Sequence, residues 1–234
     1  MNKIFLVACL TSHMTMYAQM NEFYVSITDC REGKIIGGVS GFSLYRNDSL
    51  YRKCNGFYLF DSIPDGRYYI EYDTYFGKRK SESQYIDKNT FLPSFDVCVD
   101  ELPEDIRKTT TNLFIDNLKD GEVLPMYRRY SGCFNYSNVD SLAVKKDNGN
   151  YYIIRNKKRR KLNQKQIDIL RDFEIQMRNI KESHYYSTAW CDTYIGSGKD
   201  VITYGAPMGD WEGYEYLLIQ LGFVKRRKSV YFKD

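Results

Sequence analysis

Residues 55–70 have the sequence NGFYLFDSIPDGRYYI, in which two turn signals enclose an apolar segment. Asn55-Gly56 is typical of a tight β-hairpin, because both central residues of that turn adopt positive φ. Pro64-Asp65-Gly66 supplies a second turn, so Phe57–Ile63 and Tyr68–Tyr75 are expected to be strands. A chain that reverses direction so often favours antiparallel β structure in this part of the protein.

The surrounding sequence extends this pattern through the first half of the chain. Phe23, Val25 and Ile27 alternate with Tyr24, Ser26 and Thr28, which is the two-residue period of a strand. Further short strands are expected at Val39–Tyr45, Ser83–Ile86 and Phe95–Val99. About seven short strands separated by turns predict an N-terminal all-β sandwich.

These residues also resemble a known family. The matching positions are Ile27-x-Asp29, Gly33, Ile36-x-Gly38-Val39, Asn55-Gly56-Phe57-x-Leu59 and Ile63-Pro64-x-Gly66-x-Tyr68-x-Ile70. The series is similar to the carboxypeptidase regulatory-like, transthyretin-related domain over about residues 22–100, with Ile63 where leucine is commoner. The resemblance implies a seven-stranded sandwich without catalytic residues, used in exported bacterial proteins as a spacer, stability module or ligand-contact module.

The apolar period changes in the second half of the chain. An amphipathic helix is predicted over about 163–181, with Asn163 as its N-cap. The residues that recur at three- and four-residue steps are Leu162, Gln166, Ile167, Leu170, Phe173, Glu174, Met177 and Ile180. Hairpins are expected around residues 147–150 and 196–198. A second helix over Trp211–Leu221 would be capped by Asp210 and followed by Gly222, and Ser229–Phe232 would form a last strand. This order predicts an α+β domain of no recognised family.

Net charge divides the chain at about the same place. Residues 19–102 carry 10 Lys+Arg and 13 Asp+Glu, whereas residues 103–234 carry 23 and 17. An acidic stretch with a proline, residues 100–105, is a candidate linker. We therefore expect two domains, a sandwich over 19–102 and a basic α+β domain over 103–234.

Two basic runs are candidate anion or ligand contacts: Lys157, Lys158, Arg159, Arg160 and Lys161, then Lys225, Arg226, Arg227 and Lys228. Such runs can contact phosphates or anionic lipids. The simpler alternative is that both are solvated loops.

The N-terminus indicates export. Met1–Gln19 has one early lysine, an apolar segment and Ala18 before Gln19, so residues 1–18 are expected to be a cleaved signal peptide. Leu6-Val7-Ala8-Cys9 offers an alternative with a lipid anchor at Cys9, but only eight residues precede it. The expected location is the periplasm, the outer-membrane surface or the extracellular space. An uncleaved cytosolic element is the other alternative.

Five cysteines follow the leader: Cys30, Cys54, Cys98, Cys133 and Cys191. An odd number allows at most two bridges. A Cys133–Cys191 disulfide is one hypothesis and buried free thiols are the alternative, while pairing among the first three is left open. No C-x-x-C spacing occurs and only one of the two histidines follows the leader, so neither a metal site nor a cofactor is predicted.

No sequence motif identifies a reaction. Gly196-Ser197-Gly198-Lys199 departs from the P-loop pattern at Thr193 and Asp200. Cys191 with His184 could be imagined as a thiol nucleophile and its base, but a structural cysteine and a surface histidine are the favoured interpretation. No catalytic residue is therefore assigned.

The primary hypothesis is an exported, non-catalytic binding or scaffolding protein of a bacterial cell envelope. Its ligand would be a glycan or another envelope protein, since 22 tyrosines offer potential contact surfaces. The alternatives are a secreted hydrolase with its site in the C-terminal domain and a basic anion-binding module. Export makes nucleic acid an unexpected partner, no membrane-spanning helix is expected in the mature chain, and the oligomeric state is left open.

Overall fold

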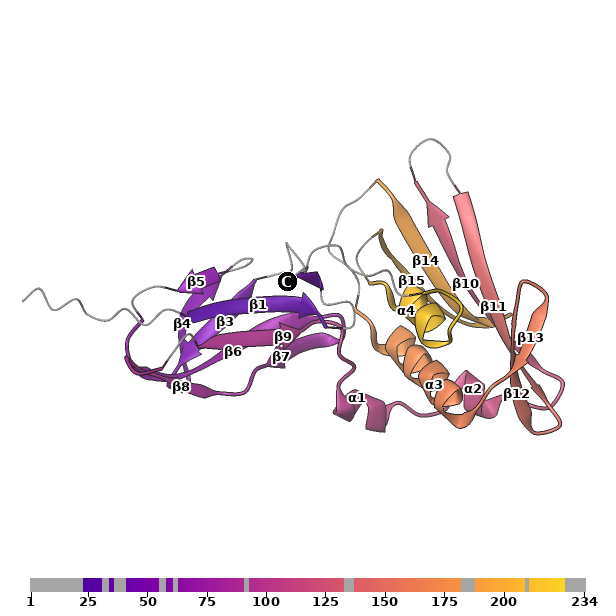
Figure 1. Ribbon diagram of the computed structural model, residues 1–234, viewed down its shortest axis with the longest axis horizontal. Coiled ribbons are helices and arrows are strands. Elements are labelled where there is room, and N and C mark those ends of the chain that lie inside the picture. The colour runs from indigo at the N-terminus through magenta and orange to yellow at the C-terminus, as the bar shows by residue number, and fades with distance from the viewer. Residues whose placement is uncertain are drawn as a thin grey trace, which may run out of the picture. The chain divides into compact units, whose positions relative to one another are not determined.

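The computed structural model describes residues 23–30, 34–35, 41–54, 58–60, 63–90, 93–132, 137–181, 188–208 and 211–225. Strands predominate and helices are few, so the predicted fold class, an all-β sandwich followed by an α+β domain, is confirmed in its predominance of β structure (Figure 1). The chain divides into two compact units. Unit 1 comprises residues 1–26, 37–72 and 80–97, and unit 2 comprises residues 27–36, 73–79 and 98–234.

The described residues form nine strands before the first helix, where about seven were expected. They are β1 (Phe23–Asp29), β2 (Lys34–Ile35), β3 (Phe42–Arg46), β4 (Ser49–Cys54), β5 (Tyr58–Phe60), β6 (Gly66–Thr74), β7 (Gly77–Lys80), β8 (Gln84–Ile86) and β9 (Ser94–Cys98). One sheet has the order β2-β1-β5 with β9 also on β1, and the other has the order β4-β3-β6-β7 with β8 also on β6.

Aromatic side chains from the two sheets meet in the core of unit 1. The rings of Phe23 (β1) and Phe60 (β5) stack with centroids 4.4 Å apart, and Phe23 also contacts Tyr68 of β6 at 6.0 Å. The Tyr68 hydroxyl donates to the Pro64 carbonyl over 2.6 Å, which fixes the predicted turn before β6. This packing is compatible with a β-sandwich.

The prediction of a hairpin at Asn55-Gly56 is wrong, because the strands on either side do not pair with each other. These two residues lie outside the described residues, but β4 and β5 on either side of them belong to different sheets. The tight turn instead joins β3 to β4, where Asn47 and Asp48 adopt φ of 48° and 63°. Asn and Asp tolerate this left-handed region better than most residues, which suits a two-residue hairpin.

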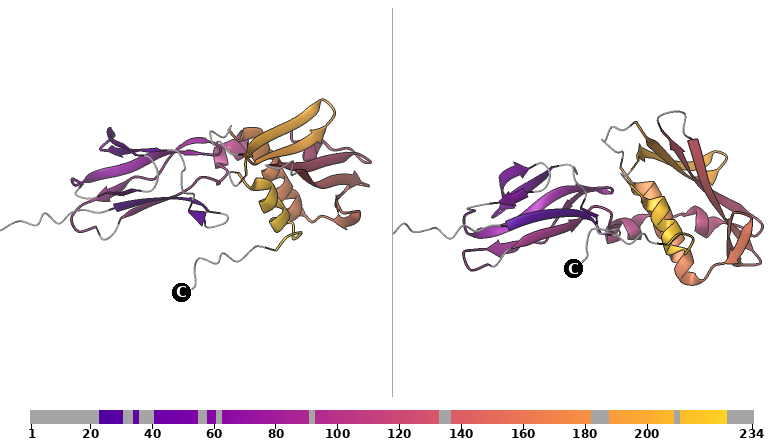
Figure 2. Two further views of the ribbon diagram at one scale, coloured as in Figure 1. Left: turned by 90° about the horizontal axis from the view of Figure 1, so that it is seen from above. Right: turned by 45° about the horizontal axis from the view of Figure 1, so that its top comes forward.

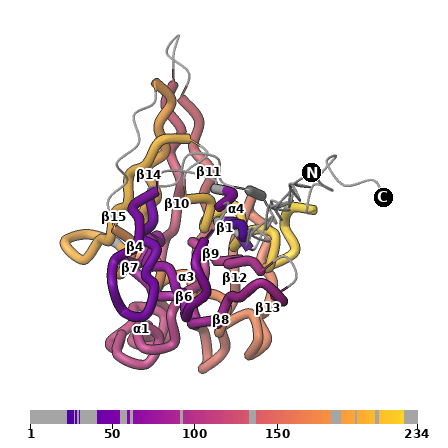
Figure 3. Tube along the Cα trace, turned by 90° about the vertical axis from the view of Figure 1, so that its left-hand side faces the viewer, coloured from indigo at the N-terminus to yellow at the C-terminus, as the bar shows by residue number. Residues whose placement is uncertain are grey.

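Unit 2 is built on one antiparallel sheet in the order β13-β12-β11-β10-β14-β15. Its strands are β10 (Val123–Ser131), β11 (Ser137–Asp147), β12 (Asn150–Arg155), β13 (Lys158–Lys161), β14 (Trp190–Ser197) and β15 (Asp200–Pro207). Figure 3 shows the edge strands β13 and β15 at opposite sides of this sheet. The helices are α1 (Glu104–Thr109), α2 (Phe114–Asn117), α3 (Gln164–Asn179) and α4 (Gly213–Gln220).

Helices α3 and α4 lie against the same face of this sheet, which we call the inner face (Figure 2). Met126, Val144, Ile153 and Ile195 are buried on the inner face against the apolar stripe of α3. Because side chains alternate along a strand, the residues between them point to the opposite, outer face. The alternation therefore assigns every strand residue of unit 2 to one face.

The ends of the long helices follow the sequence closely. Asn163 is the N-cap of α3, and its side chain forms a reciprocal capping box with Gln166, as Asn163 was expected to do. Gly222 follows α4 with φ of +76°. The predicted cap Asp210 and the predicted strand 229–232 lie outside the described residues, and α4 begins at Gly213. Among the described residues, no helix has the length and apolarity needed to cross a membrane.

Candidate functional site

A row of charged residues lies on the inner face of the unit 2 sheet. Arg128 of β10 follows Met126 at the two-residue spacing that keeps it on this face, and it is directly opposite Asp140 of β11. Arg155 of β12 lies on the same face, two residues beyond buried Ile153. The Arg128 side chain is covered by α4, so the residue is only 2% exposed. Charges at inward positions of a sheet are costly unless they are paired.

The charges in this row pair with each other. The Arg128 guanidinium donates to Glu215 of α4, and the Tyr130 hydroxyl donates to the other oxygen of the same carboxylate over 2.7 Å. Arg155 binds Asp140 through two hydrogen bonds, of 2.7 Å and 3.3 Å. Two cations therefore face two carboxylates, and these four groups together carry no net charge.

Burial has strong effects on the polar groups around this row. Burial and the hydrogen bond to Glu215 raise the pKa of Tyr130, and burial together with the charge of Asp140 raises the pKa of Tyr214. Both phenols therefore stay protonated at neutral pH. The Arg128 Nε and the Tyr214 hydroxyl are buried without a hydrogen-bond partner among the residues that the structure describes. Clustered, perturbed groups of this kind often mark functional sites.

A pocket of about 370 Å³ opens beside the Arg155–Asp140 pair. Its polar lining comes from Tyr130, Asn138, Asp140, Arg155 and Asn156. Two apolar residues complete the lining: Met208, which is 47% exposed, and Val139, which is 55% exposed and alternates to the outer face of β11. The pocket is thus lined mostly by hydrogen-bonding groups, and it has fewer apolar residues than a typical small-molecule site.

The first basic run is a strand rather than the solvated loop considered in the sequence. Asn156 and Lys157, with φ of 51° and 62°, form the tight turn that joins β12 to β13. Lys158 is directly opposite Arg155 and shares the inner face, and Arg160 is opposite Ile153 on the same face. Arg159 and Lys161 therefore point to the outer face.

Two residues of this run already have partners. Arg159 forms an ion pair with Asp147 over 2.7 Å and lies over the Tyr152 ring at 3.7 Å. Arg160 donates to the Leu221 carbonyl and lies 4.7 Å from the Phe223 ring centroid. The structure thus brings the first run beside residues 221–223. Lys225 is exposed, whereas Arg226, Arg227 and Lys228 lie outside the described residues.

The hypothesis of a Cys133–Cys191 disulfide is contradicted, because Cys191 is a free, buried thiol, as the alternative had it. Cys191 lies on the inner face opposite Tyr130, where it is buried beside the Arg128 guanidinium. Cys133 and His184 lie outside the described residues. Burial raises the pKa of the Cys191 thiol, which disfavours the thiolate that a cysteine nucleophile requires. A disulfide among the described residues joins Cys30 to Cys98.

Cys191 is therefore expected to resist alkylation. Iodoacetamide should modify Cys191 in the native protein at least about 100-fold more slowly than in guanidinium chloride, because access requires opening of unit 2. Peptide mapping by mass spectrometry measures both rates in one sample series. Equal rates in the two conditions would show that the thiol is accessible and would restore the thiol-hydrolase alternative.

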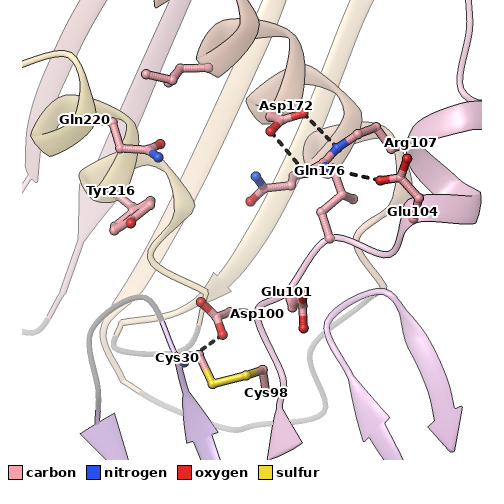
Figure 4. Close-up of a pocket in the computed structure, with 12 residues that line it drawn as sticks. Cys30, Cys98, Asp100, Glu101, Glu104, Arg107, Asp172, Gln176, Tyr216 and Gln220 are labelled. Carbon is pink, nitrogen blue, oxygen red and sulfur yellow. Dashed lines mark hydrogen bonds and ion pairs between the residues drawn. A yellow bond between two sulfur atoms is a disulfide. The ribbon is translucent and has the colours of Figure 1, made fainter. Parts of the chain in front are cut away.

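A second cavity of unit 2, of about 510 Å³, has a different character. Figure 4 shows the Cys30–Cys98 disulfide at its wall, with Asp100 accepting the Cys30 backbone N–H over 2.8 Å. Arg107 of α1 lies between Glu104 and Asp172, with nitrogen–oxygen distances of 3.2 Å and 3.1 Å. Asp100 and Leu102 are buried, so the acidic stretch expected as a linker is partly integrated into unit 2. In the parts of the chain that the structure describes, no three potential metal ligands converge.

Comparison with known proteins adds no relative: no protein family model, no curated protein and no solved structure matches this chain.

The charged row on the inner face was not predicted from the sequence. One signal was present, because the inward positions of Val123–Ser131 run Leu124, Met126, Arg128 and place a charge where an apolar residue is expected. That signal can be used only once 123–131 is known to be a strand, and the sequence pattern does not predict a strand there.

Proposed function

We propose that this protein is an exported, non-catalytic binding protein of a bacterial envelope, and that the pocket beside Arg155 and Asp140 binds a saccharide unit of an envelope glycan. The observation that carries the proposal is the composition of the pocket. Its charges are already paired, so a ligand would meet the side-chain amides of Asn138 and Asn156, together with the remaining acceptor lone pairs of the Asp140 carboxylate and the Tyr130 hydroxyl. Sugars match this set, because their hydroxyls both donate and accept and their C–H faces pack on apolar surface.

Export is supported by two features that do not depend on the pocket. The leader-like residues 1–18 precede the described residues, and the Cys30–Cys98 disulfide is of the kind that persists in oxidising compartments. The resemblance of residues 22–100 to the carboxypeptidase regulatory-like sandwich is consistent with the same proposal. We infer that this N-terminal sandwich is a spacer or stability module and that the α+β domain carries the binding site.

The proposal is tested by binding of the mature protein to an array of bacterial envelope glycans, followed by calorimetry on the saccharides that bind. Tyr130→Phe removes a hydroxyl at the pocket, and we expect affinity to fall about fivefold for one lost hydrogen bond. Tyr152→Phe is the matched control, because Tyr152 lies on the outer face beneath Arg159 and should leave affinity unchanged. Circular dichroism checks that both variants are folded.

Two results would count against the proposal. One is a blank array together with a protein partner recovered from envelope extract, which would favour the scaffolding alternative. The other is saccharide binding that Tyr130→Phe and Tyr152→Phe affect equally, which would place the ligand away from the pocket.

A further inference from the structure

The β12–β13 turn places two lysines directly after a residue that lines the proposed binding pocket. Asn156, the first residue of the turn, lines the pocket, and Lys157 and Lys158 follow it directly. Lys158 is paired with Arg155 in the sheet register, so its side chain leaves the strand on the inner face, beside Arg155. Both lysines are exposed.

The neighbouring arginines already have hydrogen-bond or ion-pair partners. Arg155 binds Asp140, Arg128 binds Glu215, and Arg160 binds the Leu221 carbonyl and covers Phe223. By contrast, neither Lys157 nor Lys158 forms an ion pair with any residue in the described ranges. The charges of the pocket itself are therefore paired, and the two lysines that follow Asn156 have no ion-pair partner in the described ranges.

This distribution of charge suits a ligand with two parts. A neutral, hydroxylated ring would fill the pocket, and an anionic substituent would project toward the lysines. A lysine ammonium is a mobile point charge that contacts a carboxylate or a phosphate without demanding a fixed geometry. The geometry points to an acidic saccharide, one that carries a carboxylate or a phosphate, as the ligand of this pocket. This inference rests on the function proposed above and narrows it.

Exposed lysines on an edge strand have another known role, since they discourage pairing with the edges of other proteins. Lys161 lies on the same edge strand but on the outer face, away from the pocket. If edge protection were the whole role of these residues, Lys158 and Lys161 would be equivalent toward a saccharide. Ligand recognition requires them to differ.

The experiment measures the affinity of the mature protein for three probes by calorimetry: α-1,4-linked galactotriose, α-1,4-linked trigalacturonate and galactose 6-phosphate. The first two differ only at C6, where a hydroxymethyl group is replaced by a carboxylate. We expect trigalacturonate to bind about three- to tenfold more tightly than galactotriose at low salt, as two exposed ion pairs allow. High salt should remove most of this preference by screening. Comparison with galactose 6-phosphate shows whether phosphate serves as well as carboxylate.

Variants assign the preference to the two lysines. Lys157→Ala/Lys158→Ala should abolish the preference for the acidic probe and leave affinity for galactotriose unchanged. Lys161→Ala, the control, should retain the preference, and Lys157→Arg/Lys158→Arg should restore it. Equal affinities of the wild-type protein for acidic and neutral probes would overturn this inference and leave the proposed function standing. Failure of all three probes to bind would count against both.

Discussion

Replacing Glu174 with alanine is expected to lower the free energy of unfolding by about 3–5 kcal/mol. Glu174 lies within α3 and is 0% exposed. Its two carboxylate oxygens accept the backbone N–H groups of Phe114 and Ile115, over 2.6 Å and 3.1 Å, at the start of α2. Arg178, one turn further along α3, forms an ion pair with it at 2.6 Å. Alanine would leave the two N–H groups without their acceptor and would remove the ion-pair partner of Arg178, which would keep its 3.3 Å hydrogen bond to the Asn112 carbonyl.

Urea unfolding followed by tryptophan fluorescence measures this effect. Glu174→Gln keeps an acceptor oxygen but loses the charge, so its loss of stability should be intermediate. Glu101→Ala removes an exposed glutamate of the same unit and should change stability by less than about 0.5 kcal/mol. A loss below about 1 kcal/mol for Glu174→Ala would mean that α2 finds other acceptors and that the buried carboxylate is not needed.

Loss of the Cys30–Cys98 disulfide should have a similar effect. The bridge joins residues 68 positions apart, and closing a loop of that length restricts the unfolded chain by roughly 4 kcal/mol. Cys30→Ser/Cys98→Ser should therefore lower the free energy of unfolding by about that amount. Urea titrations with and without dithiothreitol provide the measurement, because the reductant should destabilise the wild-type protein to the level of the double variant.

The double variant is also the control for the reductant. Its unfolding curve should be the same with and without dithiothreitol, since the other cysteines in the described part of the chain, Cys54 and Cys191, are free thiols already. A wild-type protein that dithiothreitol does not affect, although mass spectrometry shows that it has been reduced, would contradict the assignment of this stability to the bridge.

The features that could be predicted from the sequence are those that depend on nearby residues. The stripe of α3 and its Asn163 cap follow from residues within one or two turns of each other. Strand β13 was missed because four consecutive basic residues show no alternation, and its place in the sheet is set by the Asn156–Lys157 turn and by pairing with β12. A turn signal likewise cannot tell which sheet receives the next strand, which is why the Asn55-Gly56 hairpin was wrong.

The candidate site depends on contacts between distant segments. Arg128 and Glu215 are 87 residues apart, and Cys30 is bonded to Cys98 over a separation of 68. Composition gives no information about such partners. The two basic runs are visible in the sequence. Which of their residues have partners depends on the fold, because Arg159 pairs with Asp147 and Arg160 with the Leu221 carbonyl.

The interleaved course of the chain has a practical consequence for anyone who wishes to produce the C-terminal half alone. Phe76 belongs to the buried core of unit 2, and the Tyr75 carbonyl accepts the Lys181 backbone N–H over 2.8 Å. A fragment cut at residue 103 would lack both residues, and its exposed apolar surface would make it prone to aggregate. Dissection of this protein should therefore retain the hairpin around residues 73–79, supplied on the same polypeptide or added back as a peptide.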